Sequence, residues 1–240
     1  MQITSQTYQD ILASDDYWFE RKLVIAGVAY REDVLVEMTT LSEMFQKTPT
    51  IGKAVAAELS VKMLAPSAAI PRMAEVRPYV RATDGTQTSE WLPQGVFFID
   101  TRETTHNDNG LDVLTLHCYD AMLKSEADYP SSTHSWPYSD KNTVKEIAHA
   151  MGLQASISAS SGIDSRTLTL MNKNYQIELP VGYSMREVLG NIAAMYAGNW
   201  IMNYDGKLRL VTLTELPEET NYLVDQTNSP ITFGGDRILV

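Results

Sequence analysis

The stretch "EWLPQGVFFIDTRE", residues 90–103, decides how the first half of the chain folds. Its four central residues favour an extended, pleated backbone, so a β-strand is predicted from Gly95 onward. These residues are Val96, Phe97, Phe98 and Ile99. A strand with one face in water alternates apolar and polar residues, but here all four are large and apolar. The stretch therefore predicts a structural or interface strand that is covered on both faces.

Length and composition indicate a folded protein. The chain has 240 residues, 44% of them hydrophobic and 20% charged, which is enough for one large core or two modest ones. No apolar run approaches the length of a membrane span, and the first ten residues lack the pattern of a secretory signal. The single cysteine, Cys118, excludes an intramolecular disulfide. We therefore expect synthesis in a reducing cytoplasm.

The charge balance is acidic. There are 19 basic and 30 acidic residues, which gives a net charge of −11. A nucleic-acid-binding surface needs a basic patch to neutralise phosphates, so the balance argues against one. It fits an ordinary soluble acidic protein, and it also fits a surface past which DNA moves without binding. Composition does not choose between these two.

Six strands are predicted in the first half, and polar turns separate most of them. They cover 22–30, 33–41, 54–64, 75–82, 95–101 and 111–119. The third alternates cleanly between an apolar and a more polar face. In the fourth, Pro78 indicates an edge position, because proline lacks the N–H that a central strand needs. Closely spaced strands of this kind predict an antiparallel barrel or sandwich.

The second half has a helical period. Residues 128–142 are rich in proline, serine and threonine, as in a linker. A helix is predicted over 142–151 with Asn142 as N-cap, and a second helix begins at Ser184, which forms a capping box with Glu187.

Each predicted helix runs into a predicted strand. The two strands cover 153–159 and 199–204, and Asp205–Gly206 predicts a two-residue type I′ turn into a last strand at 207–213. The two helix–glycine–strand units are either copies of one repeat or convergent patterns. In both cases the second half is a small α+β unit, so the fold class is α+β and rich in β.

No catalytic, cofactor or metal site is expected. Ser184 lies in the nearest match to a nucleophile elbow, but the final glycine is missing and a helix cap suits it better. The four histidines are isolated, which gives no zinc spacing. The loop 105–110 faintly resembles a calcium-binding loop, but Thr105 stands at the first ligand position and Leu116 where the bidentate glutamate belongs, so a hairpin loop is expected. Neighbouring carboxylates, where they occur, would point to opposite faces of a strand. We therefore expect that the chain is not an enzyme.

Two stretches resemble the hub proteins of bacteriophage and prophage tails, the baseplate-hub or tail-tip family. They are "GVFFIDTRETTHNDNGLDVLTLHCYDAMLKSEADYP" and "YSMREVLGNIAAMYAGNWIMNYDGKLRLV". The first carries a G-x-[FY]-x-[IV] strand and ends in the pair Tyr119–Asp120, where Asp120 is placed to cap a short helix. The second carries an [LM]-R-E-x-L-x-x-I-A helix that starts at Met185, followed by a D-G-K-L hairpin at 205–208.

The resemblance implies a virion structural protein of the tail tip or baseplate, made in the host cytoplasm. It implies an antiparallel tube-type β-barrel over 1–126, a small α+β insertion over 127–216, and a return strand over 217–240 towards a second barrel. Such hubs are trimers whose paired barrels give a pseudo-sixfold ring.

The partners implied are other copies of the chain, tail-tube and distal tail proteins, the tape-measure protein, and DNA that passes without specific binding. No membrane span is expected. The second face of 95–101 is then covered by the neighbouring hairpin, the inserted helices or the next subunit. Any lytic activity is expected outside this chain.

Two alternatives stay open. One is a host-surface carbohydrate-binding or recognition module, for which Trp91, Trp136 and Tyr138 could supply exposed rings. The other is the non-catalytic part of a tail-associated cell-wall hydrolase.

Overall fold

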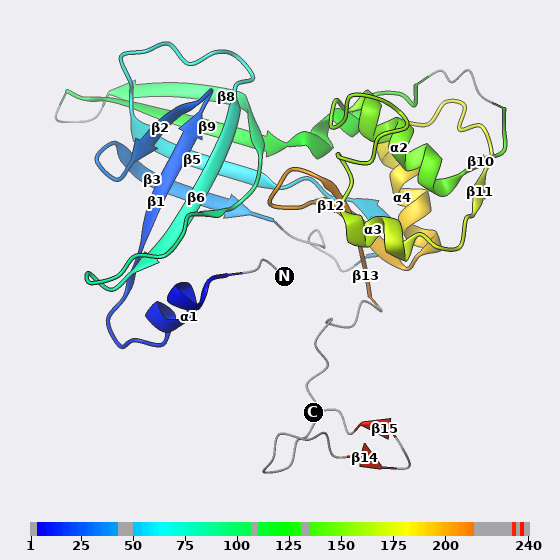
Figure 1. Ribbon diagram of the computed structural model, residues 1–240. Helices are drawn as coiled ribbons and strands as arrows, with labels where there is room; N and C mark the ends of the chain where they lie inside the picture. The colour runs from blue at the N-terminus through cyan, green and yellow to red at the C-terminus, as the bar shows by residue number, and fades with distance from the viewer. Residues whose placement is uncertain are drawn as a thin grey trace.

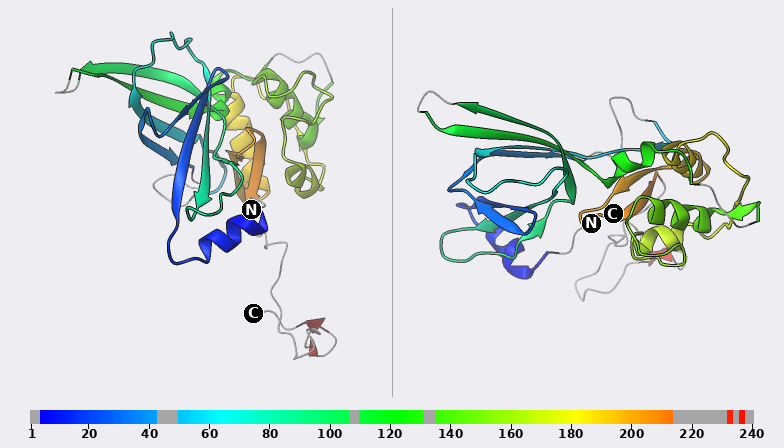
Figure 2. Two further views of the ribbon diagram at one scale, coloured as in Figure 1. Left: turned by 60° about the vertical axis from the view of Figure 1, so that its left-hand side comes forward. Right: turned by 90° about the horizontal axis from the view of Figure 1, so that it is seen from above.

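The computed structural model describes residues 4–42, 50–106, 110–130 and 135–213, together with the backbone of 232–233 and 236–237. The protein is rich in β-strands, with a few helices, as α+β predicts. Figure 1 shows a lobe of strands beside a smaller lobe that holds the longer helices, and Figure 2 shows the same two lobes from two further directions.

The first lobe contains the elements up to β9. They are α1 (Gln6–Leu12), β1 (Trp18–Ile25), β2 (Val28–Arg31), β3 (Leu35–Leu41), β5 (Glu58–Leu64), β6 (Glu75–Thr83), β7 (Leu92–Pro93), β8 (Phe97–His106) and β9 (Asp112–Asp120). The exception is β4 (Lys53–Ala54), which joins the second lobe.

The remaining elements follow β9. They are η1 (Ala121–Glu126), β10 (Tyr138–Ser139), α2 (Asp140–Ala150), α3 (Ser165–Leu170), β11 (Gln176–Ile177), α4 (Met185–Met195), β12 (Gly198–Met202) and β13 (Leu208–Thr212). A last antiparallel pair is formed by β14 (Thr232–Phe233) and β15 (Asp236–Arg237).

The strands of the first lobe form one curled antiparallel sheet. Its order is β2-β1-β6-β8-β9-β5-β3, with β7 beside β6. The inner faces share one core, which includes Leu23, Val61, Val76, Phe97 and Leu116. Among the described strands no pairing joins the end strands β2 and β3. The antiparallel topology is thus confirmed, while closure into a barrel is not.

The expected edge position of Pro78 is wrong, because β6 lies between β1 and β8. The carbonyl of Pro78 accepts a hydrogen bond from the Gln94 N–H at 2.9 Å. In an antiparallel strand the N–H and C=O of one residue point the same way, so the missing N–H faces this side. At Pro78, β8 no longer lies beside β6, because β8 pairs with β6 only at Glu75 and Val76. A central strand can therefore hold this proline.

Two predicted strands are divided in the structure. The stretch 22–30 contains a hairpin, because Ala26 and Gly27 both have positive φ (48° and 86°), which is the backbone of a type I′ turn. Alanine rarely adopts this conformation, so the sequence pattern does not reveal the turn. The stretch 54–64 divides into β4 and β5.

The second lobe packs α2 and α4 against a three-stranded sheet of order β13-β12-β4. Its core includes Ile147, Leu189, Ile192, Trp200 and Leu210. The strand β4 runs parallel to β12, although it comes from the first half of the chain.

Only one of the two predicted helix–strand units forms. The stretch 153–159 consists of turns and bends, so the expectation of a strand there is wrong. Its polar side chains are used locally: Gln154 donates to the Lys145 carbonyl at 2.9 Å, and the Ser156 and Ser158 hydroxyls lie 3.2 Å apart. Side chains that bond nearby groups favour turns over strands. The other unit, α4 followed by β12, is confirmed.

The helix caps are partly as predicted. Ser184 and Glu187 form the expected capping box at the start of α4. The helix expected at 142–151 is α2; it begins at Asp140, and its N-cap is Ser139, three residues before the expected Asn142.

The turn between β12 and β13 is longer than predicted. The Asn203 carbonyl accepts from the Gly206 N–H, and the Asn203 N–H donates to the Lys207 carbonyl, each at 2.9 Å. A type I′ turn needs positive φ at both central residues, and in this loop only Gly206 has it (76°). The loop is therefore a turn followed by a left-handed glycine.

Candidate assembly surface

Residues 96–99 of the strand quoted at the outset are covered on both faces by the same chain, whereas Asp100 and Thr101 are exposed. Phe97 and Ile99 are 1% and 2% exposed and face the core of the first lobe. Phe98 points the other way and packs against the core of the second lobe. The ammonium of Lys124 lies 4.3 Å from the centroid of its ring. Val96 is also buried, and its methyl groups lie so close to Gly206 that a Cβ there would come within 2.9 Å.

Asp120 joins the two lobes. Its Oδ1 accepts from the Met122 N–H at 2.9 Å, which caps η1 as the sequence predicts. Its Oδ2 accepts from the Ala57 N–H, also at 2.9 Å, at the start of β5. The residue is only 3% exposed, and burial raises the pKa of its carboxyl to about 6. A single carboxyl at the end of β9 thus binds both the start of η1 and the segment before β5.

Arg186, at the start of α4, ties the same region together from the other side. Its Nε donates to the Ala54 carbonyl at 2.9 Å, and its guanidinium pairs with Glu126 of η1. This role was not predictable from the sequence.

A close backbone approach completes the joint. A Cβ on Gly190 of α4 would lie 2.7 Å from the Gly52 carbonyl oxygen, so the helix and the segment before β4 touch through their main chains. Asn199 reinforces the contact, because its side chain accepts from the Lys53 N–H and donates to the Thr50 carbonyl.

Four neighbouring strands present an exposed polar face. They are β3, β5, β9 and the outer part of β8, and their registers align side chains in rows across the sheet. One row is Thr39, Ser60, His117 and Thr101, and the next is Glu37, Lys62, Thr115 and Glu103. Of these eight residues only Thr115 is half-buried, and the others are exposed. The face is rich in hydroxyls and mixed in charge.

The same four strands end in two open edges. Along one side, β3 pairs with β5 alone among the described strands. Along the other, β6 accompanies β8 only at Phe97 and Phe98, so the segment Asp100–His106 has β9 as its sole neighbour among the described strands. Every residue of that segment is exposed. The β8–β9 hairpin extends outward from the strand lobe (Figure 1). Both edges carry main-chain donors and acceptors that a further strand can use.

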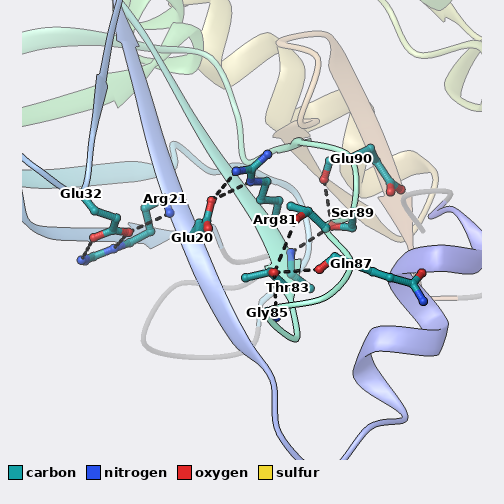
Figure 3. Close-up of polar contacts among 11 residues, drawn as sticks. Glu20, Arg21, Glu32, Arg81, Thr83, Gly85, Gln87, Ser89 and Glu90 are labelled. Carbon is teal, nitrogen blue, oxygen red and sulfur yellow. Dashed lines mark hydrogen bonds and ion pairs between the residues drawn. The ribbon is translucent and has the colours of Figure 1, made fainter.

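Charged and aromatic side chains secure the opposite end of the sheet. Arg21 pairs with Glu32 at 2.8 Å and Arg81 with Glu20 at 2.5 Å, and Thr83 closes the adjoining loop on Gln87 (Figure 3).

An alternating stack of rings and cations lies on the outer side of the same strands. The Lys22 ammonium lies 4.4 Å from the Tyr79 ring centroid and 4.5 Å from that of Trp91, and the Arg81 guanidinium lies 4.4 Å from the Trp91 centroid. These contacts hold the segment 84–94 on the sheet.

The residues considered for chemistry do not converge. Among the described residues no group of three or more histidine, cysteine or carboxylate side chains could hold a metal ion. Cys118 is buried, and burial raises the pKa of its thiol to about 12. Trp91 is remote from Trp136 and Tyr138, which pack edge to face with their centroids 5.9 Å apart. No helix in the described part of the chain is long and apolar enough to cross a membrane.

Comparison with known proteins identifies the fold. No protein-family model matches the sequence, and no curated protein does either. The structure is similar to that of the tail protein from Neisseria meningitidis MC58, with a TM-score of 0.54 and 13% identity over 88% of this chain. It also matches the 43 kDa tail protein of prophage MuSo2 from Shewanella oneidensis, with a TM-score of 0.48 and 10% identity over 86% of this chain.

The two neighbours are longer than this chain, which covers 57% and 59% of their lengths. At such identities the first comparison establishes a shared fold, that of a tail protein.

Proposed function

We propose that the chain is a structural subunit of a phage or prophage tail, the hub that joins the tail tube to the tip. The observation that carries the proposal is the group of four neighbouring strands β3, β5, β9 and outer β8, which has two open edges, on a fold shared with a tail protein. Buried joints and an absence of converging reactive groups among the described residues fit an assembly part better than an enzyme.

The two edges fit each other. Strands alternate in direction across β3, β5, β9 and β8, so placing β8 of one copy beside β3 of the next continues the antiparallel order. Such a contact uses two different surfaces, and it closes into a ring when the rotation between copies allows. We take this ring to be the trimer of tail hubs. In it, residues 1–126 form the barrel-like wall and 127–216 an outer insertion, while the return strand expected over 217–240 lies largely outside the described residues.

The polar face of the four strands then lines the bore. Its acidic groups, Glu37, Glu58 and Glu103, suit a channel through which DNA passes without binding, in a chain with a net charge of −11. Tail-tube, distal tail and tape-measure proteins are the neighbours of such a ring, and its place is the baseplate or tip of the virion tail.

The host-surface glycan module is less well supported. A glycan needs exposed ring faces, but those of Trp91 lie against Lys22 and Arg81. Trp136 packs edge-on against both Tyr129 and Tyr138.

The proposal is tested by placing charge on the two edges. A chain that carries both Thr39→Lys and Thr101→Lys should lose self-association, because both lysines lie on the polar face and repel across the contact between β3 and β8. Ala155→Lys, on an exposed turn of the second lobe, is the matched control. Sedimentation velocity of the three proteins gives the result. Equal self-association of all three proteins would show that the two edges do not mediate it.

A further inference from the structure

A cavity of about 210 Å³ lies where the two lobes meet. It is smaller than the roughly 300–1,000 Å³ of common small-molecule sites, so it suits one side chain or a very small ligand. Its lining is Ser42, Ala57, Gln94, Gly95, Val96, Phe97, Asp120, Ile201, Met202, Asn203, Tyr204 and Arg209. Apolar groups form much of the wall, and polar groups are spread among them.

Asp120 is the carboxylate in this lining. It is 3% exposed, and among the described residues no lysine, arginine or histidine nitrogen lies within 4.0 Å of its oxygens. Its two oxygens each accept one N–H, whereas an ionised carboxylate offers about four lone-pair sites. A buried carboxylate with spare acceptor capacity is costly unless a cation reaches it.

The other cations near the cavity do not neutralise this group. The pKa of Asp120 is raised by burial, and the charge of Arg186 lowers it less than the hydrogen bonds from Ala57 and Met122 do. Arg186 forms its ion pair with Glu126. Arg209 also lines the cavity, but it is not among the groups that shift the pKa of Asp120. Its charge contributes at Asp164, where burial raises the pKa and hydrogen bonds from Asn203 and the Arg166 N–H, with the charges of Arg166 and Arg209, lower it.

We propose that this cavity binds a primary alkylammonium group, with the ammonium at Asp120 and the aliphatic stem along Val96, Phe97 and Met202. A stem of a few methylenes bearing a compact charge matches apolar walls around one carboxylate. The group belongs either to a lysine of a protein that docks between the lobes or to a free diamine. The site does not depend on the ring and goes beyond the structural role.

The test uses the whole chain at pH 8, with methyl NMR of Met202, Ile201 and Val96 as the readout. The probes are 1,4-diaminobutane and Nα-acetyl-lysine methylamide, with 1-butanol as the uncharged control. Saturable shifts with either amine, absent with butanol, are the expected result, and the amine that binds more tightly identifies the source. No saturable shift with either amine, or equal shifts with butanol, would overturn the proposal.

Two variants locate the site. Asp120→Asn should weaken amine binding at least about tenfold, the scale of one charge-assisted contact, while Asp100→Asn on the exposed part of β8 should leave it unchanged. Gln94→Trp narrows the cavity without changing the Asp120 carboxylate, so it should also weaken amine binding. This second variant tests the site even if Asp120→Asn does not fold. Full binding by a folded Asp120→Asn chain or by Gln94→Trp would contradict the assignment.

Discussion

At the scale of single residues, the joint between the lobes rests on a few side chains. Asp120 was predictable as a helix cap, because a short polar side chain stands before "AMLKSEA". Its second bond, to the Ala57 N–H, was not, since 63 positions separate the two residues. The same holds for Arg186, whose acceptor at Ala54 lies 132 positions away. Sequence patterns report local bonds, and tertiary ones need the fold.

Asp120 should make stability depend on pH. Burial raises its pKa to about 6, so the folded chain keeps this proton to a higher pH than the unfolded chain. Its contribution is therefore complete below about pH 4 and is lost as the pH rises through about 6. The difference in unfolding free energy between wild type and Asp120→Asn should change by up to about 3 kcal/mol between pH 4 and pH 7. Urea unfolding at several pH values measures it. Parallel curves for the two chains would show that the carboxyl is not perturbed.

Gly190→Ala should destabilise the chain, although alanine favours helices over glycine by about 1 kcal/mol. The added Cβ would lie 2.7 Å from the Gly52 carbonyl oxygen, so α4 and the segment before β4 must separate. We expect a loss of about 1–3 kcal/mol in the free energy of unfolding. Asn191→Ala, exposed on the same helix, is the control and should be neutral or slightly stabilising. A neutral Gly190→Ala would mean that the approach is looser than described.

At the scale of elements, strands and helices with strong periodic patterns were predictable and short or irregular ones were not. The alternating stretch that became β5 and the capped helix α4 form as expected. The two-residue strand β4 carries no pattern, and its parallel partner β12 lies about 145 residues away. In 153–159 the apolar alternation was present, but no strand among the described residues pairs with it.

Ser184→Ala should test the clearest of these elements. The Ser184 hydroxyl accepts from the Glu187 N–H, and the Glu187 carboxylate accepts from the Ser184 N–H at 2.8 Å. Losing the hydroxyl should cost about 1 kcal/mol of stability, because an N–H of the first turn is left without its acceptor. Ser161→Ala, on an exposed turn, serves as control. Thermal unfolding of the three chains decides the point, and equal melting temperatures would argue against a stabilising cap.

At the scale of the whole molecule, two lobes with separate cores pack together, and the polar face of β3, β5, β9 and outer β8 stays exposed. The sequence predicted most strands of that sheet. It also predicted that both faces of 95–101 are covered, which holds for 96–99 but not for the exposed Asp100 and Thr101. It did not reveal that the second lobe covers Phe98, because an apolar pattern does not identify the segment that packs against a strand. Nor did it show which edges stay open, since an edge is a property of the pairing order.

The measurement that most directly tests the ring is the molar mass in solution, by light scattering over a concentration series, with negative-stain images of the largest species. We expect a species with three times the mass of the 26.8 kDa chain and a central hole. The molar mass should fall to that of a single chain when both β3 and β8 carry the added lysines. A wild-type chain that stays at 26.8 kDa at every concentration, or an assembly that the edge lysines leave unchanged, would contradict it.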